Sequence, residues 1–200
     1  MRSTFGRAYG RVLVLATLVA AMLVPAVASA ATETFHRFEV EATANYTITE
    51  QCPDGSTRTS RVTVIGGYEE ETEFGETTSD EFVTVLIRRI DCDFNQTFIR
   101  ASGPAEFTYS PSLGEASVSG TLVTNDGRTI EVDMTWEGVG GVETTTNTTT
   151  FPGFHGVFQS RERQAVATGT VVLDGETLVD GSTTNASIES LEDTNRTTAE

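Results

Sequence analysis

The sequence contains no lysine. All 13 of its basic residues are arginine, and they stand against 29 acidic residues, which gives a net charge of −16. Residues 1–30 hold three of the arginines and no acidic residue, so the rest of the chain carries 10 arginines, 29 acids and a net charge of −19. Nucleic acids and anionic membranes are held mainly by basic side chains. The charge therefore predicts that neither is a partner, and it favours a cation or a cell-surface ligand.

Residues that commonly carry catalysis are also scarce. The two histidines, His36 and His155, have no nucleophile beside them in the sequence. The motifs G-x-S-x-G and H-E-x-x-H, the P-loop and the paired-glycine nucleotide motif are all missing. We expect no cofactor and name no catalytic residue, and the sequence leans against an enzyme. A hydrolase site built from scattered carboxylates stays open as an alternative.

After residue 30 no hydrophobic run is long enough to span a membrane as a helix. Residues 1–30 have the three parts of a secretory signal peptide. Three arginines precede an apolar stretch at 12–24, and Ala28-Ser29-Ala30 provides the small residues of a cleavage site. We predict cleavage after Ala30 and a secreted, extracellular mature chain without a membrane span.

Only two cysteines are present, Cys52 and Cys92. In an exported protein two cysteines commonly form a disulfide, and here the bridge would close a loop of about 41 residues. A pair of free reactive thiols is the alternative, although the C-x-x-C spacing typical of redox sites is absent. We predict a disulfide that ties two strand ends together.

Alternating apolar and polar residues fill most of the chain and predict β-strands, because side chains point to opposite faces of a strand in turn. The strongest such pattern spans 118–136, two alternating runs joined by Asn125-Asp126-Gly127, as in a β-hairpin. Another long strand is predicted over 34–50. The run at 82–87 is apolar on both faces, which predicts a central strand covered on both sides.

These patterns predict one all-β domain over residues 31–191, with nine or ten strands in an antiparallel β-sandwich or a small β-barrel. Alternation does not distinguish the two. Residues 69–81 are predicted to form a solvated acidic loop, and 138–150 a mobile loop rich in Gly and Thr. The pair Gly66-Gly67 suggests a β-bulge or a bend. Residues 192–200 are expected to form a polar, disordered tail.

Aromatic residues next to the 138–150 loop form the candidate ligand-contact cluster: Trp136, Phe151, Phe154, His155 and Phe158. Aromatic faces there could contact a sugar or an apolar ligand. Trp136 has the same parity as Ile130, Val132 and Met134, however, so it shares their face of the strand, and this favours its burial in the core.

No metal site is predicted. Asp91 and Asp93, with the acidic stretch 69–81, provide oxygen ligands of the kind that calcium takes. They lack the D-x-D-x-D-G spacing of a calcium loop, so solvated charge and a weak calcium site are the two interpretations.

The features after Trp136 follow a familiar order: W-E-G-V-G-G, a Thr-rich stretch, aromatics near His155, R-x-R-x-A-x-A-x-G-T-V and an Asp-Gly turn. Over residues 118–188 the chain resembles uncharacterised exported β-rich proteins of actinobacteria. The resemblance implies no activity, cofactor or site residue.

Three functional hypotheses follow. The first is an exported protein with a binding or structural role at the cell surface or in the medium. The second is a small barrel that binds an apolar ligand, and the third is the carboxylate-dependent hydrolase. A ligand-sized internal cavity would favour the second, and a cleft with two carboxylates of unlike environment would favour the third.

Overall fold

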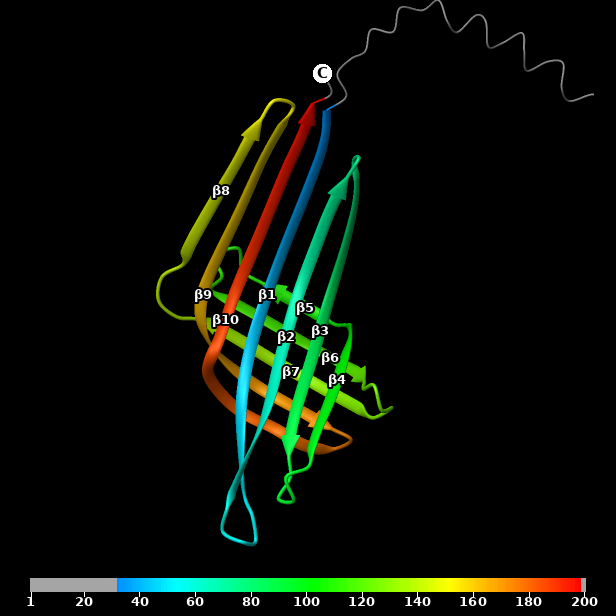
Figure 1. Ribbon diagram of the computed structural model, residues 1–200, viewed down its shortest axis with the longest axis vertical. Helices are drawn as coiled ribbons and strands as arrows, with labels where there is room; N and C mark the ends of the chain where they lie inside the picture. The colour runs from blue at the N-terminus through cyan, green and yellow to red at the C-terminus, as the bar shows by residue number, and fades with distance from the viewer. Residues whose placement is uncertain (1–31, 199–200) are drawn as a thin grey trace, which may run out of the picture.

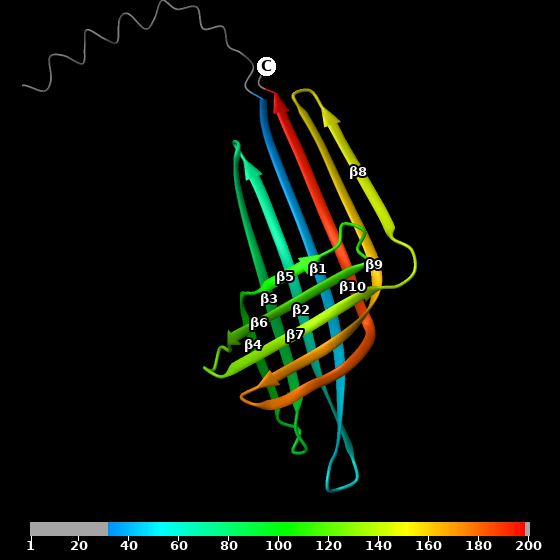
Figure 2. The same ribbon diagram turned by 180° about the vertical axis from the view of Figure 1, so that it is seen from behind.

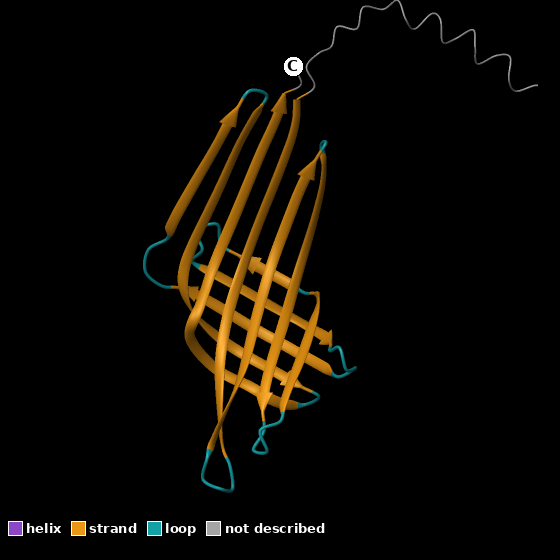
Figure 3. Ribbon diagram, in the orientation of Figure 1, coloured by secondary structure: helices purple, strands orange, loops and turns teal. Residues whose placement is uncertain are grey.

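The computed structural model describes residues 32–198 and contains strands but no helix (Figure 3). The predicted signal peptide lies outside the described residues. All strand pairs are antiparallel. The ten strands are β1 Thr32–Gln51, β2 Thr57–Glu73, β3 Glu76–Ile90, β4 Gln96–Pro104, β5 Glu106–Tyr109, β6 Glu115–Val123, β7 Thr129–Gly138, β8 Glu143–Phe151, β9 Phe154–Leu173 and β10 Glu176–Thr198.

The strands form a single sheet in the order β4-β3-β2-β1-β10-β9-β7-β6-β5, with β8 paired to the first half of β9. Two sets of consecutive strands, β1–β4 and β5–β7, are thus joined by the β9–β10 hairpin. The sheet is not closed, so the barrel prediction is wrong, and the all-β prediction is confirmed as an open sheet of β-sandwich type.

The sheet folds into two layers because β9 and β10 bend. The first half of β9 lies in the layer of β1–β4, and its second half pairs with β7. Figure 2 shows β5, β6 and β7 running obliquely across the face of β1–β3. The pairing of β9 with β10 shifts register between Thr183 and Ala186, and Gly181 has a φ of +143° that residues with side chains rarely adopt. These irregularities produce the bend.

The core lies between the two layers. In the middle of β1 every second residue is buried, namely Val40, Ala42, Ala44 and Tyr46. The predicted 118–136 hairpin is confirmed as β6–β7, and it contributes Met134 and Trp136, which are fully buried. The indole Nε1 of Trp136 donates a hydrogen bond to the carbonyl oxygen of Thr43 at 3.0 Å. Trp136 is therefore a core residue.

The disulfide prediction is confirmed, since Cys52 and Cys92 are bonded with a Cα–Cα distance of 5.6 Å. The bridge joins the β1–β2 turn to the β3–β4 turn at one end of the sheet. At the opposite end β1, β2, β3, β8, β9 and β10 extend past the second layer (Figure 1). There the sheet is one layer thick.

Three segments predicted to lack regular structure belong to this extension. The acidic stretch 69–81 is the β2–β3 hairpin, which turns at Phe74-Gly75. Most of the 138–150 loop is β8, and residues 192–198 end β10, paired with β1 and β9. In each case hydrogen bonds to neighbouring strands outweigh a polar composition that by itself suggests a loop.

Two local features of β2 and β3 differ from expectation. The pairing of β2 continues one residue for one through Gly66 and Gly67 without a bulge. A Cβ on Gly67 would lie 2.4 Å from the ring of Phe82, so a larger residue there would displace that ring. The 82–87 run is covered on one face only, since Leu86 is exposed.

Candidate functional site

The candidate aromatic cluster is divided by the fold. Trp136 is buried in the core, whereas the other four members lie in the single-layer extension at the β8–β9 hairpin. The rings of Phe151 and Phe154 stack with centroids 4.6 Å apart, and the His155 Nδ1 lies 3.0 Å from the Thr150 hydroxyl. Phe158 is exposed. The structure thus brings together residues at a hairpin tip and places the tryptophan elsewhere.

Asp91 has a structural role in the β3–β4 turn. One of its carboxylate oxygens accepts the backbone N–H groups of Asp93 and Asn95, both at 2.9 Å, and the other accepts the Asn95 amide at 3.0 Å. Hydrogen bonding to Asn95 lowers the pKa of Asp91. No three His, Cys, Asp or Glu residues within 32–198 are grouped to hold a metal ion. The same part of the chain contains no helix that could cross a membrane.

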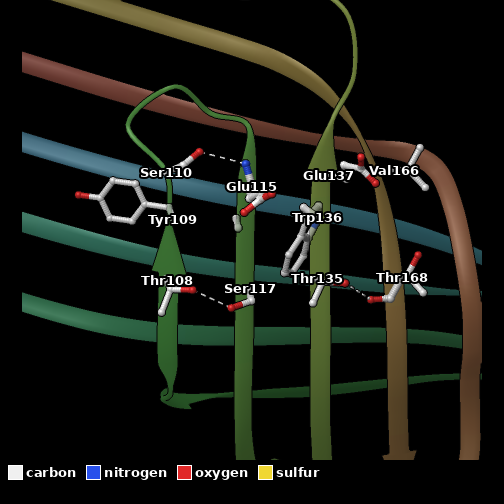
Figure 4. Close-up of a pocket in the computed structure, with 11 residues that line it drawn as sticks. Thr108, Tyr109, Ser110, Glu115, Ser117, Thr135, Trp136, Glu137, Val166 and Thr168 are labelled. Carbon is white, nitrogen blue, oxygen red and sulfur yellow. Dashed lines mark hydrogen bonds between the residues drawn. The ribbon is translucent and has the colours of Figure 1, made fainter.

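A trough of about 440 Å³ lies on the outer face of the β5–β6–β7–β9 layer (Figure 4). Hydroxyl residues on four neighbouring strands form a row across it: Thr108, Ser117, Thr135 and Thr168. Glu115 and Glu137 are directly opposite each other beside the row, and both are exposed. Their surroundings are alike, whereas hydrolysis by two carboxylates requires environments that keep one protonated and one ionised.

A crevice between the two layers is small by comparison. It measures about 80 Å³, opens near the disulfide end and is lined by isoleucine and leucine side chains and by Arg89. Arg89 pairs with Glu50 and Glu176 at its edge. Sites for drug-sized ligands usually measure about 300 Å³ or more. This crevice is therefore too small for the kind of ligand that the apolar-ligand hypothesis requires.

A surface that the sequence analysis missed lies on the outer face of β2, β3 and β4, toward the disulfide end. We define the arginine surface as Arg61, Arg88 and Arg100 with the exposed apolar residues Leu86 and Phe98. These residues alternate with the buried Val62, Val85, Ile87 and Ile99, so they share the outer face. Arg61 is directly opposite Arg88, which is opposite Phe98, and Leu86 is opposite Arg100.

No ion pair within residues 32–198 neutralises the three arginines. None forms an ion pair with any residue of the described chain, although acids outnumber basic residues two to one. Like charges directly opposite each other in a sheet are destabilising, so the pairing of Arg61 with Arg88 costs stability. The neighbouring outward positions of β1 in these rows are Asn45 and Thr47, which are uncharged.

Acidic residues occupy the other half of the same face. From the level of Gly67 to the β2–β3 turn, on the side away from the disulfide, the outward residues of β1, β2 and β3 are mostly acidic. They include Glu39, Glu41, Glu69, Glu71, Glu73, Glu76 and Asp80. Arg37 is the basic residue among them, and it pairs with Glu39 at 3.1 Å and Glu69 at 2.8 Å. The outer face of β1–β4 is thus negative along the extension and positive near the disulfide.

The chain was compared with known proteins at three levels. No family model, no curated protein and no solved structure matched it. The similarity of residues 118–188 to exported actinobacterial proteins therefore remains a proposal.

Proposed function

We propose that this protein is exported and binds an anionic polysaccharide through the arginine surface, at the cell surface or in the medium. The observation that carries the proposal is the pair of facing arginines, Arg61 and Arg88, without a carboxylate partner in the described chain. A cost to stability at an exposed position is explained if an external anion neutralises it. The disulfide is compatible with an extracellular location.

The chemistry of the surface favours a polymer that combines sugar rings with carboxylate or phosphate groups. Guanidinium groups bind such anions through two parallel hydrogen bonds. The face of Phe98 provides an apolar platform for a ring, and the surface is open across three strands instead of being hollowed into a pocket. The rest of the molecule is strongly negative and repels any long polyanion, so the contact with the polymer is confined to the arginine surface.

The test is binding of residues 31–200 to polygalacturonate, a polymer of uronic acid, with neutral dextran as the reference. We expect binding at 20 mM salt that weakens steeply by 200 mM, because paired charges are screened. The variant R61Q/R88Q/R100Q should bind at least about tenfold more weakly. Each charged hydrogen bond is typically worth roughly 1.5–3 kcal/mol, and a smaller contribution is expected here because water screens charges on an open surface.

R128Q is the matched control for the removal of an arginine. Arg128 lies in the β6–β7 turn, where its guanidinium Nε is 3.0 Å from the carboxylate of Asp126, so its loss should leave binding unchanged. Equal binding by the wild type and the triple variant, or equal affinity for dextran, would refute the proposal.

A further inference from the structure

The free edge of β8 lacks the features that usually prevent strands from pairing between molecules. β8 contains no Pro, Lys or Arg, has one charged residue, Glu143, at its start, and pairs with β9 over nine residues without a bulge. All nine residues are exposed. Natural edge strands are commonly protected by such charges, prolines or bulges, or by being short. Here β5 has four residues, β4 ends in Pro104, and the extended part of β3 carries Glu76, Asp80 and Glu81.

The turn between β8 and β9 determines which backbone groups of β8 are free. The two residues Pro152-Gly153 connect Phe151 directly to its partner Phe154, and such a closing pair exchanges both backbone hydrogen bonds. Bonded pairs recur at every second residue of an antiparallel ladder. The N–H and C=O groups of the even-numbered residues therefore point to the free edge, namely Thr144, Thr146, Thr148 and Thr150.

The sequence of β8 is symmetrical about Asn147. Three threonines precede it and three follow it, over residues 144–150. If two β8 strands pair antiparallel about a two-fold axis at Asn147, Thr146 faces Thr148 of the second copy and Thr144 faces Thr150. Even-numbered residues then meet even-numbered residues, so every free N–H and C=O among them finds a partner. Threonine pairs directly opposite each other are also favourable in sheets.

We propose that β8 pairs with β8 of a second copy of this chain, in the register that places Asn147 opposite Asn147. The dimer joins the two sheets into one continuous sheet through eight backbone hydrogen bonds, two from each of the four even-numbered threonines on one strand. Glu143 lies opposite Phe151 of the second copy, so the two glutamates of the strand pair are kept apart. The arginine surface, on β2–β4, has no part in this contact.

Electrostatics gives the dimer a recognisable salt dependence. Both copies carry a large net negative charge, which opposes association at low ionic strength. Salt screens this repulsion but leaves neutral backbone hydrogen bonds and threonine contacts largely intact. The dimer should thus become tighter as salt increases, whereas polysaccharide binding by the arginine surface should become weaker. Failure of one proposal is thereby distinguished from failure of the other.

The register is tested by cysteine cross-linking in residues 31–200, where Cys52 and Cys92 are already bonded to each other. Two copies of position 147 would form a pair without backbone hydrogen bonds, with Cα atoms about 4.5 Å apart, which suits a disulfide. The variant N147C should form a covalent dimer under mild oxidation at least tenfold faster than the control T145C. Two copies of position 145 would lie about 13 Å apart along the strands.

Sedimentation of the unmodified chain and of T146P/T148P provides a second measurement. These prolines remove N–H groups that point away from β9, so β8 stays paired with β9 while the free edge is blocked. We expect a dimer that tightens between 20 and 500 mM salt, and a monomeric variant with an unchanged melting temperature. A wild-type monomer at 1 mM protein in 500 mM salt, or equal cross-linking of N147C and T145C, would overturn the proposal.

Discussion

Glu41 lies at the end of a row of four glutamates that crosses four strands of the sheet. Glu143 on β8, Glu162 on β9, Glu189 on β10 and Glu41 on β1 are successive cross-strand partners on the outer face. Burial raises the pKa of Glu41, and the nearby carboxylates of Glu39, Glu189 and Glu69 raise it further. The folded state therefore binds a proton at Glu41 more tightly than the unfolded chain does, and the ionised form opposes folding.

The variant E41Q should stabilise the protein at neutral pH. A like-charged neighbour directly across a sheet costs roughly 0.2–1 kcal/mol, and Glu41 has Glu189 opposite it and other carboxylates close by. At low salt we expect a gain of about 1 kcal/mol in the free energy of unfolding, which corresponds to about 3 °C in melting temperature for a domain of this size. Thermal unfolding followed by circular dichroism measures the difference.

The sign of the pH dependence follows from the direction of the pKa shift. The penalty is complete above the raised folded-state pKa and disappears below the ordinary value of 4.5, where Glu41 is protonated in both states. The advantage of E41Q over the wild type should thus be present at pH 7.5, vanish at pH 3.5 and shrink in 0.5 M salt. E131Q is the control, since Glu131 faces Thr121 and Val172. A gain equal at both pH values, or a loss at pH 7.5, would refute the reasoning.

Three further predictions concern the fold. C52S/C92S should lower the free energy of unfolding by about 4 kcal/mol, because the bridge closes a loop with a separation of 40 residues; urea denaturation measures the loss, and a loss below about 1 kcal/mol would contradict the estimate. W136F should lower the free energy of unfolding by about 2 kcal/mol, because the Thr43 carbonyl loses its indole donor. The tryptophan fluorescence of the wild type should resist quenching by iodide, and ready quenching would show that the indole is exposed. G169A should lower the free energy of unfolding by about 2 kcal/mol or more in the same urea assay, since a Cβ there would lie 2.1 Å from the Asp133 carbonyl oxygen. An unchanged urea midpoint would mean that the backbone has room for the methyl group.

Sequence alternation predicted the strands that border the core, because burial of one face imposes a period of two on Val40, Ala42 and Ala44. It also predicted the burial of Trp136, whereas the disulfide was predicted from the presence of two cysteines in an exported chain. It failed where the sheet is one layer thick, since both faces of β8 are exposed there and no apolar period marks the strand. Composition then resembles a loop, and only the pairing with β9 shows otherwise.

The arginine surface could not be predicted for a different reason. Arg61, Arg88 and Arg100 each stand at an ordinary polar position of a strand, and the sequence gives no register to show that Arg61 and Arg88 face each other. One signal was available, namely that Arg61 and Arg100 have no acidic residue within four positions in a very acidic chain. The bend of β9 and β10, which places two layers face to face, depends on a register shift that alternation does not encode.

The position of the β9–β10 hairpin has a consequence for the order of folding. Within β1–β4, and likewise within β5–β7, each strand pairs with the strand that follows it in the sequence. Both sets can therefore form from local contacts. The hairpin that joins them is the last described part of the chain, yet it fills the centre of the sheet between β1 and β7. Until it docks, those two strands present unpaired backbone and their apolar faces lack a complete partner layer. Folding should therefore be slow, as in other proteins dominated by distant contacts, and the interval before docking is when the chain is most exposed to aggregation.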